Sequence, residues 1–319
     1  MPFDIQPSAL ILCMALSIDV FFGEWPKAIH PVVWVGRGIA LLQRLAPVGP
    51  WYLQLTAGML MAVIVPAGCV MLTLLALWAL AGWPLASSIL GVYLLKSTFA
   101  LRALGAAARE VQRALMQGDF AAARGALRHL CGRDAQALNA PLMLAATAES
   151  LAENASDSFI APLFFYLLFG LPGAVFYRAV NTLDAMVGYR GVYEYFGKAS
   201  ARLDDLLNYI PARLTAALLV CAGCFTRASV RGGLAILRRD KYKTDSPNAG
   251  WPMAAMAGLL RVQLEKPGHY RLGDAHEALV PSKIDTALWL TRGACVAAVC
   301  IVLAVLFVLG GPHVYANAG

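Results

Sequence analysis

Long apolar runs separated by short polar segments make up most of this chain. Crossing the roughly 30 Å hydrocarbon core of a bilayer takes about 20 apolar residues in a helix. Three runs reach that length, at 53–80, 84–101 and 287–310. A fourth run, 8–22, is shorter and carries Asp19 near its end, but it follows Pro7 and Ser8, which mark a helix start. We count 8–22 as the fourth span.

Two further apolar runs are weaker. The run 159–177 is interrupted at Gly170-Leu-Pro-Gly173, and the run 212–226 is short. The pattern leaves open whether each run crosses the bilayer, is re-entrant or is simply buried. Residues 102–130 have the pattern of two amphipathic, alanine-rich helices joined at Gly118-Asp119, and no segment shows the alternation of a strand.

These patterns predict an all-α polytopic integral membrane protein. It has about four full spans plus short or re-entrant apolar helices and a cytoplasmic polar region, all in a single membrane domain, 1–319.

Composition supports this class. The chain is 59% hydrophobic and only 14% charged, and its mean hydropathy is +0.63, which excludes an ordinary soluble protein. The net charge of +7 could indicate a nucleic-acid partner. However, the basic residues are scattered between apolar runs rather than gathered on one face, so we expect no nucleic acid, and the partner is the lipid bilayer.

The basic residues predict an orientation through the positive-inside rule. They follow the first and third spans, at Lys27, Arg37, Arg44, Arg102, Arg109 and Arg113. We therefore expect an inner-membrane protein with a cytoplasmic active face. The cytoplasmic parts would be an amphipathic helical insertion, 102–158, and the loops and short helices of 178–286. We interpret the seven cysteines as buried thiols, because most lie in or beside apolar runs, and Cys221 and Cys224 lack the flanks of a redox motif.

Three carboxylates recur at helical spacing. Glu149, Glu153 and Asp157 stand at i, i+4 and i+8, which on a helix places them along one stripe beside Asn154. Their mutual repulsion would be relieved by Mg²⁺, which prefers one or two carboxylates plus phosphate oxygens. A solvated helix face is an equally good interpretation of the spacing alone.

Two more mixed clusters of carboxylates, amides and arginines follow. One contains Arg178, Asn181 and Asp184, and the other contains Arg202, Asp204, Asp205, Asn208 and Arg213. Such groups suit phosphoryl or acyl-phosphate chemistry, in which carboxylates hold the metal and arginines clamp phosphate. The alternative is a set of salt bridges, such as Arg178 with Asp184 or Arg202 with Asp205.

Three other segments carry weaker signals. Gly191 to Lys198 is no Walker A loop, because its glycine spacing is wrong and Ala199 occupies the Ser/Thr position. Ser246 to Pro252 is typical of a turn opening a helix, where free N–H groups can bind an anion or merely form a cap. His30 lies in a polar, turn-rich exit from the first span and by itself indicates a structural histidine.

Taken together, these segments resemble the adenosylcobinamide-phosphate synthases of cobalamin biosynthesis, the CobD/CbiB family. The matching motifs occur in the family's order and cover most of the chain outside the plain spans. They are the block at 19–36, ES-x-AEN-x-x-D at 149–157, APLF at 161–164, YRAVNTLDAMVGYR at 177–190, FGK-x-x-ARLDDLLNYIPARLTA at 196–216 and SPNAGWP-x-AAMAG at 246–258.

The resemblance implies an ATP-dependent acid–amine ligase in the membrane. Adenosylcobyric acid would be joined through a propionate to an amino-alcohol phosphate such as (R)-1-aminopropan-2-yl phosphate, giving adenosylcobinamide phosphate. Phosphorylation by ATP would turn the carboxylate into an acyl phosphate that an amine can attack. ATP and Mg²⁺ would be required, and other membrane enzymes of the cobalamin pathway are candidate partners.

On this resemblance we assign roles to the motif residues. Glu149, Glu153 and Asp157 would hold Mg²⁺ and ATP, and Asp184 would assist or act as a base toward the attacking amine. The remaining residues would bind phosphate, orient amides or shape the corrinoid pocket: His30, Asn154, Arg178, Asn181, Arg190, Lys198, Arg202, Asp204, Asp205, Asn208, Arg213 and Asn248.

The resemblance is weaker in two places. The link from Tyr189 to Gly197 is shorter than in some family members, which leaves the accepted amino-alcohol open, and 265–286 matches no motif. We interpret His269 and His276 in that segment as surface residues. Two other functions compete with the ligase. One is a membrane sensor or regulator on the same scaffold, which would be expected to lose the polar clusters, and the other is a lipid-phosphate transferase.

Overall fold

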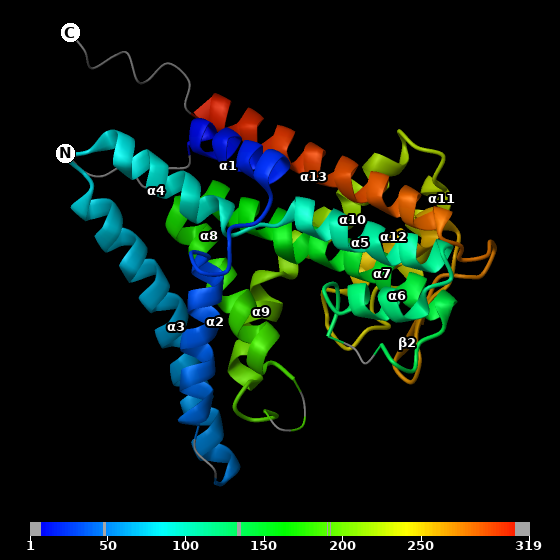
Figure 1. Cartoon of the computed structure of the whole chain (residues 1–319), viewed down its shortest axis with the longest axis horizontal. Helices are drawn as coiled ribbons and strands as arrows, with labels where there is room; N and C mark the ends of the chain where they lie inside the picture. The colour runs from blue at the N-terminus through cyan, green and yellow to red at the C-terminus, as the bar shows by residue number, and fades with distance from the viewer. Residues whose placement is uncertain (1–7, 47–48, 133–134, 190, 192, 310–319) are drawn as a thin grey trace. The chain divides into compact units, whose positions relative to one another are not determined.

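The computed structural model describes residues 8–309 except 47–48, 133–134, 190 and 192. The chain divides into two compact units, each described by itself below. Unit 1 comprises residues 1–100, 161–207 and 300–319, and unit 2 comprises residues 101–160 and 208–299. Almost all the described secondary structure is helical, which confirms the predicted fold class (Figure 1).

Unit 1 is built from helices that pack around α8. Its helices are α1 (Ala9–Phe22), α2 (Pro31–Arg44), α3 (Trp51–Ala79), α4 (Pro84–Lys96), α8 (Ala161–Val187) and α9 (Lys198–Leu207). Helix α8 packs against α2, α3, α4 and α9, and α1 packs against α4. A side chain at Gly58 of α3 would collide with the carbonyl oxygen of Phe196, just before α9, so glycine allows the two backbones to touch.

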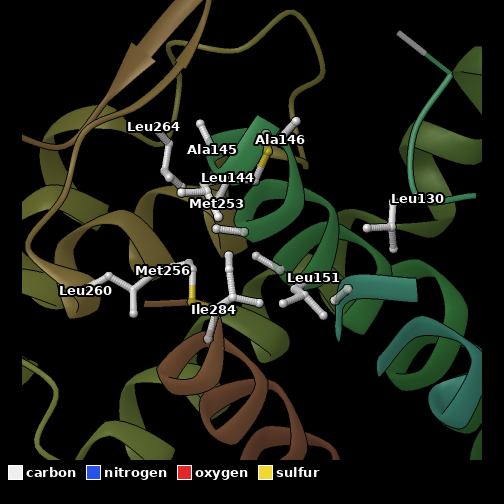
Figure 2. Close-up of a cluster of buried hydrophobic side chains, with 14 of the residues drawn as sticks. Leu130, Leu144, Ala145, Ala146, Leu151, Met253, Met256, Leu260, Leu264 and Ile284 are labelled. Carbon is white, nitrogen blue, oxygen red and sulfur yellow. The ribbon is translucent and has the colours of Figure 1, made fainter. Parts of the chain in front are cut away.

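Unit 2 contains the remaining elements. They are α5 (Leu101–Met116), α6 (Phe120–Leu127), α7 (Ala140–Ala155), the π-helical turn η1 (Ser156–Ile160), α10 (Tyr209–Gly223), α11 (Val230–Asp240), α12 (Gly250–Leu260), β1 (Leu264–Lys266), β2 (Tyr270–Leu272) and the part of α13 (Ser282–Leu309) up to Val299. Figure 2 shows its core, where Leu144 and Leu151 of α7 meet Met253 and Met256 of α12 and Ile284 of α13. Helix α7 is therefore held on several sides, which fixes the carboxylates that it carries.

The predicted number of spans is confirmed, but one of the four differs. By length and composition the described helices include four candidate spans, at Trp51–Ala79, Pro84–Met116, Ala140–Val187 and Ser282–Val308. The run 8–22 forms a helix of only 14 residues and is not among them. The run 159–177 belongs to the third candidate, although Gly170 has a left-handed φ of 63° and bends α8 at the interruption seen in the sequence. The run 212–226 forms most of α10, which could span only together with α9.

The amphipathic helical pair is confirmed. Gly118 adopts a positive φ of 72°, which ends the turn after α5, and Asp119 caps α6 by accepting a hydrogen bond from the backbone N–H of Ala122 at 2.9 Å. The side assigned to 102–158 and 178–286 stays a prediction, because the structure contains no membrane.

Two further expectations were wrong. A short antiparallel hairpin, β1–β2, lies where no strand was expected, since strands of three residues are too short to show alternation. The cysteines are not generally buried: of the seven, only Cys295 is, and all are free thiols. An apolar helix built to face lipid exposes much of its surface, so a position in an apolar run does not imply burial.

Candidate functional site

The carboxylate motif of α7 runs into a π-helical turn. Glu149 is 1% exposed and accepts a hydrogen bond from the hydroxyl of Tyr270 at 3.2 Å, whereas Glu153 and Asp157 are partly exposed. Asp157 lies within η1, and single π-helical turns inside helices occur frequently at functional sites. Tyr270 comes from the hairpin that the sequence analysis did not predict.

The three carboxylates do not form a ready-made metal cage. Among the residues that the structure describes, no three of His, Cys, Asp and Glu lie in an arrangement that could hold a metal ion. A π-helical turn takes up more residues than an α-helical one, so it alters the i, i+4 register on which the expected stripe depended. Because Mg²⁺ commonly takes one or two carboxylates and completes its shell with phosphate and water, the metal site stays a prediction.

Three of the polar motifs are neighbours within unit 2. Helix α10 packs against η1 and α12, and α12 packs against α7. Arg213 of α10 donates a hydrogen bond at 3.2 Å to the side-chain oxygen of Asn248, which lies just before α12. Asn208 is buried directly before α10. Asn154 donates a hydrogen bond to the Ser150 carbonyl and accepts one from the Ser158 hydroxyl. Its side chain therefore links the last turn of α7 to η1.

Unit 1 holds the other predicted cluster, on α8 and α9. Arg178 donates to the side-chain oxygen of Asn181 at 3.2 Å, and the amide of Asn181 donates to Asp204 at 3.4 Å. The structure thus brings together three residues from two successive motifs, with Asn181 and Asp204 separated by 23 positions. The backbone carbonyl of Asp184, about one helical turn after Asn181, accepts a hydrogen bond from the N–H of Gly188.

The other predicted residues of unit 1 are more exposed. Arg202 and Asp205 are 4.0 Å apart on one face of α9, and this pair has the exposed character of salt bridges that contribute little to stability. Lys198 is exposed at the first residue of α9. Arg190 lies outside the described residues. The site roles given to all these side chains stay predictions.

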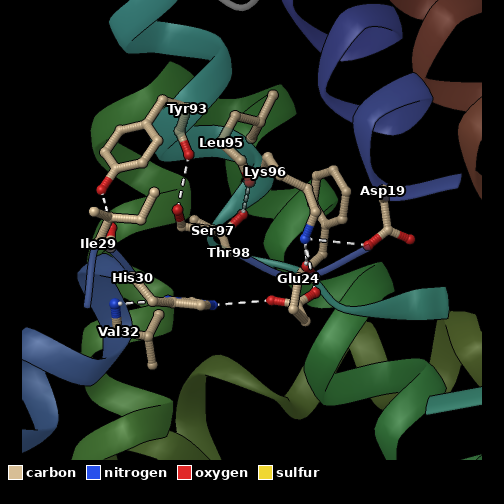
Figure 3. A network of polar contacts seen from close by, with 11 residues as sticks. Asp19, Glu24, Ile29, His30, Val32, Tyr93, Leu95, Lys96, Ser97 and Thr98 are labelled. Atoms are coloured by element: carbon tan, nitrogen blue, oxygen red, sulfur yellow. Dashed lines mark hydrogen bonds and ion pairs between the residues drawn. The ribbon is translucent and has the colours of Figure 1, made fainter. Parts of the chain in front are cut away.

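An ion network centred on the buried Lys96 includes His30 in unit 1 (Figure 3). The Lys96 ammonium is fully buried and lies 3.2 Å from a carboxylate oxygen of Asp19 and 2.7 Å from one of Glu24. His30 contacts Glu24 at 2.9 Å through Nε2 and accepts the N–H of Val32 through Nδ1, which caps α2. These contacts give His30 a role in capping α2, and its part in shaping the corrinoid pocket stays a prediction.

The pKa of Glu24 reflects this network. Burial by itself would raise the pKa of the Glu24 carboxyl, but the hydrogen bonds with His30 and Lys96, and their positive charges, lower it below its usual value. Neither Glu24 nor Lys96 was predicted from the sequence as a functional or structural residue. The signal for Lys96 was an ionisable residue within the apolar run 84–101, where such a residue requires a partner.

Comparison with known proteins agrees with the resemblance. Residues 12–291 match the family described as CobD/Cbib protein. A cobalamin biosynthesis protein CobD from Dehalococcoides mccartyi is 44% identical over 303 residues, which cover 93% of this chain and 97% of the relative. A probable CobD from Pyrococcus furiosus is 44% identical over 82% of this chain and 87% of its own length, and a CobD from Rhodobacter capsulatus is 42% identical over 82% and 83%. No solved structure matches the chain. Because the match contains every polar cluster described above, the chain belongs to the CobD/CbiB family.

Proposed function

We propose that this protein acts in cobalamin biosynthesis as an ATP-dependent ligase. It would join the propionate carboxylate of adenosylcobyric acid to the amine of an amino-alcohol phosphate, with ADP and phosphate as the other products. The observation that carries the proposal is the family match over residues 12–291, a range that includes the segments 149–157, 178–213 and 246–258. A regulator that had lost catalysis would have no reason to keep these groups.

The side chains present fit a magnesium nucleotide. Glu153 near the end of α7 and Asp157 in η1 are partly exposed carboxylates, and hard oxygen ligands are what Mg²⁺ requires. Bound there, the nucleotide would supply a phosphoryl group that makes the substrate carboxylate reactive. Tyr270 holds the buried Glu149 carboxylate in one orientation, so this acid positions its neighbours in the motif.

The chain's own residues would handle charge and protons. The attacking ammonium must lose a proton before its nitrogen can form the amide bond, and Asp184 is our candidate for the base. We expect Arg178, which is hydrogen-bonded to Asn181 in unit 1, and Arg213, which is hydrogen-bonded to Asn248 in unit 2, to hold phosphate. We expect the protein to lie in the inner membrane with these groups on the cytoplasmic side, where ATP is available.

Reconstitution tests the proposal. The purified protein is incubated with ATP, Mg²⁺, adenosylcobyric acid and one amino-alcohol phosphate at a time, and mass spectrometry detects the amidated corrinoid. We expect product and an equal amount of ADP, with neither formed when the corrinoid is omitted. Product that forms equally well without ATP would contradict the ligase. Absence of product with every amino-alcohol phosphate, from protein that is folded and inserted, would favour the regulator.

A further inference from the structure

Two cations converge on one aromatic ring in unit 2. The Arg213 guanidinium lies 4.4 Å from the centre of the Trp251 ring and 3.5 Å from that of Tyr209. The Lys241 ammonium also lies 4.4 Å from the centre of the Trp251 ring. The two charges are therefore no further apart than twice that distance. Cations over indole faces are favourable contacts, but they do not neutralise charge.

Neither cation has an acidic partner in the part of the chain that the structure describes. The neighbouring basic residues differ in this respect, because Arg239 lies 2.7 Å and Lys243 lies 2.6 Å from the buried carboxylate of Asp240. Lys241 stands between them in the sequence and turns to Trp251 instead. Two positive charges at this separation repel each other, and an anion that contacts both would reduce that cost.

The Arg213 guanidinium is fixed by hydrogen bonds and keeps donors for a ligand. Arg213 donates from one nitrogen, Nη1, to the Tyr209 carbonyl and to the side-chain oxygen of Asn248, which is 5% exposed. These are its hydrogen bonds within the described residues, so Nη2 and Nε keep donors for a second acceptor. An arginine fixed by such bonds can take two oxygens of one phosphate at a small entropic cost.

From this geometry we infer that Arg213, Lys241 and Trp251 form a binding site for the phosphate of a phosphate monoester, without a metal ion. The contacts around the two cations come from aromatic rings, an amide and a carbonyl, whereas a magnesium-bound phosphate chain would call for carboxylates. The inference rests on the proposed function in one respect. It assigns this site to the phosphate of the amino-alcohol substrate rather than to ATP.

Binding in the presence of EDTA tests the site. The full-length protein in nanodiscs of zwitterionic phosphatidylcholine is titrated with (R)-1-aminopropan-2-yl phosphate by calorimetry. Lys241→Gln should weaken binding about tenfold or more, since one charge-assisted contact is lost, and Lys241→Arg should restore most of the affinity. Arg238→Gln is the matched control, because it removes an exposed charge from the same segment and should leave the affinity unchanged. The unliganded melting temperature of each variant shows that it is folded.

Several outcomes would overturn the inference. These are unchanged affinity in Lys241→Gln, equal losses in Lys241→Gln and Arg238→Gln, or a strict requirement for Mg²⁺. Binding of phosphatidic acid in the nanodisc that depends on Lys241, with no binding of the soluble ester, would assign the cations to a lipid headgroup and would also overturn the inference. If the protein binds the ester without metal through Lys241 but makes no amide product, the phosphate site stands and the ligase proposal fails. If Lys241→Gln makes product normally with an unchanged KM for the amino-alcohol phosphate, the ligase proposal stands and the phosphate site fails.

Discussion

The Lys96 ammonium lies 2.7 Å from the carboxylate of Glu24, and no part of its side chain reaches solvent. The carboxylate of Asp19, on α1, lies 3.2 Å from the same ammonium. This pairing ties the end of α4 to α1 and to the loop that leads into α2. Burying a charge is costly unless an opposite charge compensates it. Removing one member of this cluster would leave a buried charge without compensation and would destabilise the fold.

Lys96→Met should therefore destabilise the protein strongly. The substitution keeps the length and the apolar stem of the side chain but leaves Asp19, which is 3% exposed, without its cation. We expect a loss of about 3–5 kcal/mol, measured as a lower melting temperature in detergent. Lys27→Met, at an exposed lysine in the same loop, is the control and should change little. Equal melting temperatures for the two variants would show that the network contributes nothing to stability.

Glu153→Gln should abolish the amidated product while membrane insertion and melting temperature stay near wild type. The carboxylate is partly exposed at the end of α7, so the amide can replace it sterically but cannot supply a negative oxygen to a metal. Product is measured by mass spectrometry in the reconstituted reaction. Glu110→Gln removes an exposed acid from α5 of the same unit and should keep full activity. Wild-type turnover by Glu153→Gln would remove the metal-site prediction.

Gly58→Ala should destabilise α3 packing by about 1–3 kcal/mol or more, because the new methyl group would lie 1.9 Å from the carbonyl oxygen of Phe196. Gly68→Ala lies on the same helix with nothing within 4 Å of the added carbon. That control should be neutral or stabilising by up to about 1 kcal/mol, since alanine favours helices over glycine. The melting temperatures of the two variants are compared. An unchanged melting temperature for Gly58→Ala would contradict the close approach of α3 to the Phe196 carbonyl.

Asp240 should make stability fall at low pH. Burial alone would raise the pKa of this carboxyl, but hydrogen bonds from Arg239, Lys243 and the N–H of Gly273 outweigh it and lower the pKa from 3.8 to about 2. A lowered pKa contributes stability that is complete above the unfolded value and is lost as the pH falls through the folded one. The contribution at neutral pH is therefore at most about 2 kcal/mol, and it disappears between about pH 4 and pH 2.

Melting curves at a series of pH values test the contribution of Asp240 to stability. Asp240→Asn should be less stable than wild type at pH 7, and the difference should shrink as the pH approaches 2. Asp245→Asn, which removes an exposed carboxylate in the same loop region, should follow wild type at every pH. A difference between Asp240→Asn and wild type that stays constant down to pH 2 would show that titration of Asp240 is not its source.

Local features of the molecule were predictable from the sequence. The long apolar helices, the bend at Gly170 and the helical pair joined at Gly118 follow from hydropathy, periodicity and backbone preferences within a few residues. The motif order, which identifies the family, is also a property of the sequence alone. The one misassigned span, 8–22, shows the limit: its composition was apolar enough, but its helix ends at Gly23 after 14 residues.

The sequence by itself determined an all-helical membrane protein of the CobD/CbiB family and the residue types available for its chemistry. Tertiary structure decided which of those residues work together. Lys96 reaches Glu24 across 72 residues and Tyr270 reaches Glu149 across 121, and no local pattern encodes such pairs. The physical reason is that a charge or hydroxyl in an apolar surrounding must find its partner wherever packing places one, and packing is a property of the whole fold.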